Sequence, residues 1–169
     1  EIDQLGTINE VKGDTIKINA TSDYVGSILG RSIDTSIAIE NVSVTNANIS
    51  GGNYVGGLTG YSSIHNSEIY DSDITGKGYV GGITGYLCYR NDTTARAKLI
   101  VDNCNISGTN SFLGGITGFL SNTGNVNGIV RNSVIEGLTT SSNSVGGIVG
   151  GSQYTMRYNA VIDTQIISK

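Results

Sequence analysis

The sequence predicts an all-β fold, a parallel β-solenoid of about five to six coils in which similar strands stack along one axis. Two internal repeats carry this prediction, and each of them has the composition of short strands. The absence of helical periodicity supports it. No window of the sequence shows successive turns of apolar residues at the 3.6-residue spacing of an amphipathic helix.

The composition limits the class of protein. The 169 residues include 25 Gly and no Pro or Trp, 37 % are hydrophobic, and 14 % are charged, with a formal net charge of −4. This length suits one domain with a narrow core. The 10 Lys and Arg residues are scattered among 14 acidic residues, so no basic stripe for nucleic acid is predicted. No apolar run approaches the roughly 20 residues of a membrane-spanning helix, so no membrane insertion is predicted.

The first repeat is a glycine-rich segment of seven residues. It reads YVGSILG at 24–30, YVGGLTG at 54–60, YVGGITG at 79–85, FLGGITG at 112–118 and SVGGIVG at 144–150. The paired glycines predict a bulge or sharp corner, where only glycine tolerates the backbone conformation or the close approach of another chain segment.

The second repeat lies between these copies and has the composition of a strand. It reads VTNANISG from Val44, IYDSDITG from Ile69, VDNCNISG from Val101 and VRNSVIEG from Val130, with a weaker fifth copy, RYNAVIDT, from Arg157. Short runs rich in Ile, Val and Thr and closed by Gly, Asn or Ser are typical of strands. The isoleucine column, Ile49, Ile74, Ile106 and Ile135, continued at Ile162, is predicted to be buried and stacked, with Val55, Val80, Leu113 and Val145 also inside.

Two further columns follow from the same alignment. The polar column Asn46, Asp71, Asn103, Asn132 and Asn159 predicts an amide ladder at a bend, in which each side chain hydrogen-bonds the next coil. The aromatic column Tyr24, Tyr54, Tyr79 and Phe112 offers candidate ligand-facing residues, because carbohydrate and peptide partners often stack on such rings. The alternative is that these rings only stack on one another.

The ends of the chain differ from the repeats. Residues 1–23 are predicted to form an N-terminal cap or opening coil, and residues 24–169 the solenoid, with projecting loops near 86–99 and 120–128. The chain opens at Glu1 without a leader and is interpreted as a domain of a longer protein. Its last strand segment has no corner motif after it, so we expect the C-terminal coil to be the less protected end and to be followed by a further coil or domain.

The sequence offers few candidates for catalysis. Asp71 and Asp73 could face Asp102 on the next coil, as a glycosidase pair requires, but the alignment interprets them as polar variants of structural positions. His65 is the single histidine and is interpreted as a surface turn residue. Cys88 and Cys104 lack metal-ligand spacing and either pair or fill a packed wall. No metal or cofactor is predicted.

The quoted unit, [YF]-V-G-G-[IL]-T-G followed by V-x-N-[ASC]-x-I-x-G, resembles the GLUG-type repeats of bacterial surface and secreted proteins. Such repeats occur in adhesin-like proteins and in the non-catalytic part of IgA-specific zinc metallopeptidases. The resemblance covers roughly Tyr24 to Ile167 and implies a right-handed parallel β-helix on an extracellular bacterial protein. The zinc enzymes carry an HExxH helix, which this chain lacks, so their activity is not carried over.

These observations predict a non-enzymatic extracellular module, structural or adhesive, that is tethered through the rest of a larger bacterial surface protein. A host glycan or protein is the expected partner. One alternative is a carbohydrate-active β-helix enzyme that uses the acidic residues above. The other is an accessory non-catalytic segment of a secreted protease.

Overall fold

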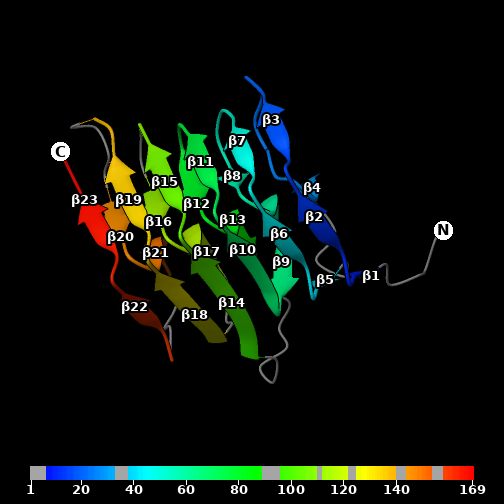
Figure 1. Cartoon of the computed structure of the whole chain (residues 1–169). Helices are drawn as coiled ribbons and strands as arrows, with labels where there is room; N and C mark the ends of the chain where they lie inside the picture. The colour runs from blue at the N-terminus through cyan, green and yellow to red at the C-terminus, as the bar shows by residue number, and fades with distance from the viewer. Residues whose placement is uncertain are drawn as a thin grey trace.

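The architecture was analysed in a computed structural model, which describes residues 7–32, 38–88, 96–109, 112–121, 125–139, 144–153 and 158–169. These residues form 23 strands and no helix. All strand pairings among them are parallel, and the strands stack from the N-terminal to the C-terminal end of the molecule (Figure 1). The predicted parallel β-solenoid is confirmed.

The strands form four walls that run along the solenoid axis. Wall 1 contains β8 (Val55–Gly56), β12 (Tyr79–Gly81), β16 (Phe112–Gly114) and β20 (Ser144–Gly146). Wall 2 contains β1 (Thr7–Asn9), β4 (Leu29–Arg31), β5 (Ala38–Glu40), β9 (Thr59–His65), β13 (Thr84–Cys88), β17 (Thr117–Ser121) and β21 (Val149–Ser152). Wall 3 contains β2 (Lys12–Asp14), β6 (Ser43–Thr45), β10 (Ser67–Tyr70), β14 (Arg96–Asp102), β18 (Asn125–Arg131) and β22 (Ala160–Ile162). Wall 4 contains β3 (Lys17–Asn19), β7 (Asn48–Ser50), β11 (Asp73–Gly76), β15 (Asn105–Gly108), β19 (Val134–Gly137) and β23 (Gln165–Ile167).

Each complete turn passes through walls 1 to 4 in order. Four such turns, β8–β11, β12–β15, β16–β19 and β20–β23, begin with the glycine-rich segments from residues 54, 79, 112 and 144. Before them lies a less regular coil, which starts at the isolated bridge from Val25 to Val55 and continues through β4–β7. Strands β1–β3 pair with β5–β7 and form an opening coil. Residues 1–6 and the centres of the two predicted loops, 89–95 and 122–124, lie outside the described residues.

The core is a set of aliphatic ladders on the inner side of the walls. Ile49, Ile74, Ile106 and Ile135 pair in register along wall 4, and each is at most 1 % exposed. Val55, Val80 and Leu113 are equally buried on wall 1, as predicted. Val145 packs on the core but is only partly buried, because β20 is the edge strand of wall 1 and, in the described part of the chain, only β16 pairs with it.

The predicted position of the fifth copy of the second repeat is wrong, because the copy begins four residues later, at Val161. The register pairs Val130 with Val161 and Ile135 with Ile166, so the copy reads VIDTQIIS and not RYNAVIDT. Asp163, not Asn159, therefore occupies the bend. Asn159 instead accepts a hydrogen bond from the Gly128 N–H at 2.8 Å. The pattern [VI]-x-[ND]-[ACST]-x-I, which places the same number of residues between its first aliphatic residue and its isoleucine in every copy, identifies the correct placement.

The polar column stands at a bend, as predicted. Asn46, Asp71, Asn103, Asn132 and Asp163 have φ angles between 45° and 55°. Asn and Asp adopt this left-handed conformation more readily than other non-glycine residues, which explains why they recur there.

The predicted amide ladder is only partly formed. Within the column, Asn103 Nδ2 donates to Asp71 Oδ1 at 2.6 Å. Asn46 and Asn132 donate instead to Asp14 and Asp102, at 2.9 and 2.8 Å, each on the preceding coil but outside the column. A carboxylate accepts without needing to donate, so an available aspartate displaces the amide-to-amide bond.

Close approach of neighbouring coils, and not unusual backbone conformation, explains the glycine-rich corners. No glycine in the described part of the chain has a positive φ. A Cβ on Gly81 would lie 2.5 Å from Thr117 Cα and 2.6 Å from Ile116 O of the next coil. The glycines therefore allow successive coils to pack backbone against backbone at the corner.

Cys88 and Cys104 are free and buried. Cys104 occupies the small-residue position after the bend, the same position as Ser72 and Ser133, and its Sγ lies 3.2 Å from Asp102 O. Burial raises the pKa of the Cys104 thiol to about 12, so it is protonated at physiological pH. Both cysteines act as small residues of a packed wall.

Candidate ligand-facing surfaces

The predicted aromatic column is part of a double ladder of rings. Tyr24, Tyr54, Tyr79 and Phe112 stack with centroid separations of 4.7, 4.9 and 5.3 Å and small interplanar angles. A second column on wall 2, Tyr61, Tyr86 and Phe119, stacks at 4.8 and 5.3 Å. Rings of the two columns meet edge to face with centroid separations of 5.3 to 6.3 Å. Both arrangements are favourable for aromatic pairs.

The double ladder is covered at both ends. The Arg31 guanidinium carbon lies 4.7 Å from the Tyr24 ring centroid and 5.6 Å from that of Tyr61. At the other end, a Cβ on Gly151 would lie 2.6 Å from Phe112 Cδ1 and 2.9 Å from Phe119 Cδ2, so this backbone covers both rings. A partner could therefore reach ring edges and phenol hydroxyls but not ring faces.

Sequence reasoning identified one of the two ring columns. Tyr24, Tyr54, Tyr79 and Phe112 come together as the alignment predicts, and Ser144 continues the column without a ring. The second column was missed, although it had a signal. Tyr61, Tyr86 and Phe119 each follow the glycine that closes a copy of the first repeat, as TGY, TGY and TGF.

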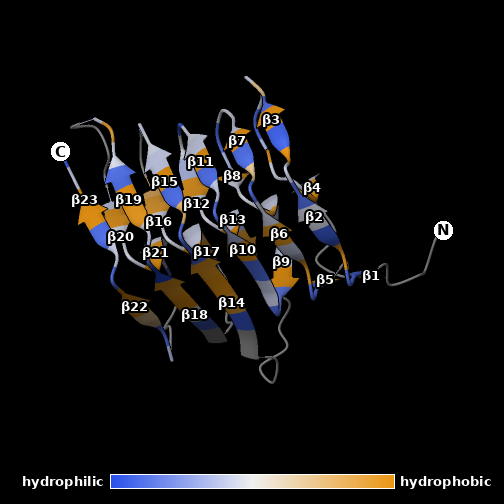
Figure 2. Ribbon diagram, in the orientation of Figure 1, coloured by the Kyte–Doolittle hydropathy of each residue, from blue (hydrophilic) through white to orange (hydrophobic). Residues whose placement is uncertain are grey.

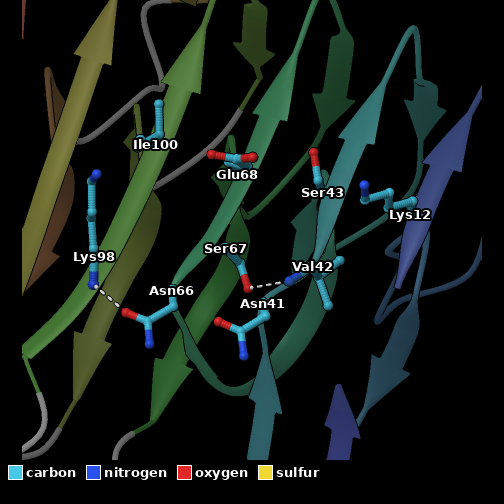
Figure 3. A pocket seen from close by; sticks show the side chains of 9 residues that line it. All are labelled: Lys12, Asn41, Val42, Ser43, Asn66, Ser67, Glu68, Lys98 and Ile100. Carbon is cyan, nitrogen blue, oxygen red and sulfur yellow. Dashed lines mark hydrogen bonds between the residues drawn. The ribbon is translucent and has the colours of Figure 1, made fainter. Parts of the chain in front are cut away.

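A shallow groove crosses the outer face of wall 3 (Figure 3). Its volume is about 390 Å³, and it is lined by Lys12, Asn41, Val42, Ser43, Asn66, Ser67, Glu68, Lys98 and Ile100. The register places Lys12, Ser43, Glu68 and Ile100 side by side on β2, β6, β10 and β14. The small Ser43 between two long side chains leaves the hollow.

The groove offers polar groups of several kinds. Lys12 and Lys98 carry positive charge, and Glu68 lies between them on β10, the strand next to that of Lys98. Asn66 Oδ1 accepts from the Lys98 backbone N–H at 3.5 Å, and Ser67 Oγ accepts from the Val42 N–H at 3.2 Å, so both side chains are held (Figure 3). Such a surface can hydrogen-bond hydroxyl, amide or carboxylate groups of a ligand. Sequence reasoning missed it, because its residues come from four coils and form no local motif.

Tyr70 lies on the same wall as the groove and has a perturbed phenol. Its hydroxyl donates to Glu68 Oε2 at 2.8 Å. Partial burial, together with this hydrogen bond to Glu68, raises the pKa of Tyr70 to about 12 from its ordinary value of 10.0.

The raised pKa predicts a loss of stability at alkaline pH. Between about pH 10 and about pH 12 the unfolded chain releases the Tyr70 proton and the folded chain retains it, so the free energy of unfolding falls as the pH rises. Urea denaturation across this range is expected to show that Tyr70→Phe is less sensitive to pH than the parent chain. Equal pH slopes for the two proteins would contradict this assignment.

The acidic residues considered for catalysis each bind a neighbouring side chain. Asp71 accepts from Asn103 as described above, and Asp73 Oδ1 accepts from Asn105 Nδ2 at 2.8 Å. Asp102 accepts from Arg131 Nε and from Asn132 Nδ2, both at 2.8 Å. Asp102 pairs with Tyr70, one position before the bend at Asp71. The carboxylates of Asp71, Asp73 and Asp102 therefore link successive coils.

His65 ends β9, where it pairs with Glu40, and its Nε2 lies 3.2 Å from Ser63 Oγ. Among the described residues, no group of three or more His, Cys, Asp or Glu side chains is placed to hold a metal ion. The same residues contain no helix that is long and apolar enough to cross a membrane.

Comparison of the chain with models of protein families, with curated proteins and with solved structures finds no match.

Proposed function

We propose that this chain is a stiff, non-enzymatic module of an extracellular bacterial protein, which acts as a spacer or presents an adhesive wall. The observation that carries this proposal is the continuity of the ladders along the axis. Isoleucine stacks on isoleucine in the core, and ring stacks on ring on the outside. Each coil is thereby fixed to its neighbours on several sides, which resists bending of the stack. The extracellular and bacterial assignments rest on the resemblance to GLUG-type repeats.

The use of the carboxylates supports a structural role over catalysis. A general acid or nucleophile has to reach its substrate, with two carboxyl groups about 5 to 10 Å apart around the bond that breaks. Asp71, Asp73 and Asp102 instead accept hydrogen bonds from side chains of the neighbouring coil. Ligand binding on this proposal uses the groove on wall 3 and the outer edges of Tyr24, Tyr54, Tyr79 and Phe112, with a host glycan or a protein as the partner.

Two assays on the same preparation test this proposal. A panel of neutral and acidic polysaccharides is incubated with the chain, and new reducing or unsaturated ends are measured. We expect none, and we expect a glycan or protein array to show binding that weakens in Lys12→Ala or Lys98→Ala. As a matched control, Lys77→Ala removes an exposed lysine outside the groove and should bind as the parent does.

Two other results of these assays would change the proposal. Release of sugar ends that is lost in Asp71→Ala or Asp102→Ala would establish the carbohydrate-active alternative. Binding that is unchanged in both groove variants would remove the groove from the proposal and leave the spacer role.

A further inference from the structure

The groove on wall 3 continues into a second hollow on the same outer face. The second hollow has a volume of about 340 Å³ and is lined by Lys12, Gly13, Asp14, Ser43, Thr45 and Asn46. Lys12 and Ser43 line both hollows, so the two adjoin at these residues. The combined groove crosses β2, β6, β10 and β14, and the outer two of these strands are about 14 Å apart. Its length suits a chain of linked units rather than one small molecule.

Two lysines of this groove, Lys12 and Lys98, are not neutralised by the described part of the chain. Both are exposed. The two ion pairs among the described residues involve Arg131 and Lys169, so neither groove lysine takes part in one. An ammonium group without a carboxylate partner attracts an anionic group of a ligand, and the exposed position lets a ligand reach it.

The two acidic residues that line the groove are hydrogen-bonded to other side chains. Asp14 Oδ1 accepts from Asn46 Nδ2 at 2.9 Å and from Thr15 Oγ1 at 3.2 Å. Glu68 Oε2 accepts from the Tyr70 hydroxyl at 2.8 Å. The chain itself therefore orients both carboxylates, which gives the groove a defined pattern of charge.

The charges of the first hollow alternate in sign. Glu68 lies between Lys12 and Lys98, and Figure 3 shows its carboxylate between the ends of the two lysine side chains. An anionic unit of a ligand is attracted beside each lysine, and the like charge of Glu68 repels one placed between them. A carboxylate accepts hydrogen bonds from hydroxyl groups. The favoured ligand therefore carries a neutral, hydroxyl-bearing unit between two anionic units.

The remaining lining suits sugars rather than a peptide. Asn41 and Asn66 contribute amide groups and Ser43 a hydroxyl for hydrogen bonds with sugar hydroxyls, and Ile100 offers an apolar surface to ring C–H groups. A peptide that binds through its backbone adds to the free edge of a sheet. Three of the four strands, β6, β10 and β14, already pair on both sides. The groove thus presents mainly side chains, which a hydroxyl-rich ligand can use.

The outward column that runs through the groove is polar only within it. This column starts at Lys12 and contains Glu68, becomes apolar at Ile100, and continues with Ile129 and Ala160. Figure 2 shows the hydrophilic colour on β2 and the hydrophobic colour on β22 and over much of β18. The ionic groups that this column offers to a ligand therefore lie within the groove.

We propose that the two hollows form one extended site for an acidic glycan chain in which anionic and neutral sugars alternate. This rests on the proposed function, because it names the class of ligand for the same wall. One anionic group lies beside Lys12, where the hollows meet, and a second lies beside Lys98. The neutral sugar between them donates a hydroxyl to Glu68. Carboxylate and sulfate both carry the charge that lysine recognises, so either group can serve.

Titration calorimetry with the 169-residue chain tests the site on defined oligosaccharides. Hyaluronan oligosaccharides alternate a uronate with a neutral sugar, and the octasaccharide is expected to bind at least about tenfold more tightly than the disaccharide. Reducing the carboxyl groups of the octasaccharide to alcohols should lower its affinity at least about tenfold, and rising ionic strength should weaken the binding of the acidic form. Keratan sulfate oligosaccharides, whose only charge is sulfate, show by their relative affinity which anion the lysines prefer.

Glu68→Gln tests the alternation of charge. Oligogalacturonate is anionic at every sugar, so the parent should bind its octasaccharide at least about tenfold more weakly than that of hyaluronan. Glutamine removes the repelling charge of Glu68, so the variant should bind the two octasaccharides with similar affinity. A parent that does not distinguish them would show that Glu68 does not select the ligand, and would overturn the alternating pattern.

Two variants test the position of the site. Lys12→Glu reverses the charge where the hollows meet, and Ser43→Tyr fills that junction without a change of charge. Each should lower the affinity for the hyaluronan octasaccharide at least about tenfold, whereas Lys12→Arg should retain it. Lys77→Glu and Thr75→Tyr are the matched controls, because they add the same side chains at exposed positions outside both hollows. All five proteins should keep the circular dichroism spectrum and melting temperature of the parent.

Failure of this site can be distinguished from failure of the proposed function. Equal affinity for the acidic octasaccharide and its carboxyl-reduced form would overturn the site, as would no binding of any acidic chain, or groove variants that bind as the parent does. Binding of a neutral glycan or a protein would then leave the proposed function in place. Release of sugar ends from any of these oligosaccharides would instead overturn the proposed function, whatever the affinities show.

Discussion

Gly118→Ala is expected to lower the free energy of unfolding by at least about 3 kcal/mol or to prevent folding. A Cβ at Gly118 would lie 2.5 Å from Val80 N, 2.8 Å from Gly85 O and 2.8 Å from Tyr79 C. All three atoms belong to the backbone of the preceding coil, so no side-chain rotation relieves the overlap. Urea denaturation followed by circular dichroism measures the loss.

Gly108→Ala is the matched control, because it adds the same methyl group at another glycine of the repeat. There the Cβ would meet Leu113 Cδ1 at 3.4 Å and Val80 Cγ2 at 3.5 Å, which is ordinary contact with flexible side chains. This variant should retain nearly all of its stability. Equal losses in the two variants would show that glycine is required for a reason other than the spacing between coils.

Ile106→Ala is expected to lower the free energy of unfolding by about 2 to 5 kcal/mol, the usual cost of a large-to-small change in a packed core. Ile106 is 1 % exposed and lies between Ile74 and Ile135 in the wall 4 ladder, so the cavity would have packed residues on both sides. The circular dichroism spectrum should remain that of a β protein.

Ile18→Ala tests the same column at the opening coil. Ile18 pairs with Ile49 on one side and is only partly buried, so its truncation should cost clearly less than that of Ile106. Similar losses at the two positions would mean that the ladder does not stabilise the solenoid coil by coil.

The repeats predict most of the fold, because a solenoid places residues that are equivalent in sequence next to one another in space. Ile49, Ile74, Ile106 and Ile135 could be assigned to one buried column from their spacing alone. The fifth copy was misplaced because the run from Arg157 to Thr164 imitates the repeat with an Asn, an Ala and an Ile. Only the spacing from Val161 to Ile166, identical to that from Val130 to Ile135, distinguishes the correct register.

The surfaces were less predictable than the core, for a physical reason. The groove depends on which side chains of different coils lie side by side, and its hollow arises from the small size of Ser43 between Lys12 and Glu68. A single copy of the repeat contains no information about such neighbours. The first ring column was predicted because its members belong to the repeat itself, and the covering of its ends by Arg31 and Gly151 was not, since neither residue is part of an aromatic pattern.

The coils differ in length chiefly at the corner between walls 2 and 3. In the turn β8–β11, β9 ends at His65 and β10 begins at Ser67, whereas one turn later β13 ends at Cys88 and β14 begins at Arg96. Strands of the two turns nevertheless pair with each other on all four walls. The number of residues at this corner can therefore change without changing the height that a coil adds to the rod. An insertion there would leave the neighbouring coils in place, so foreign peptides grafted at successive corners would be displayed on one side of the rod at intervals of about 4.8 Å per coil.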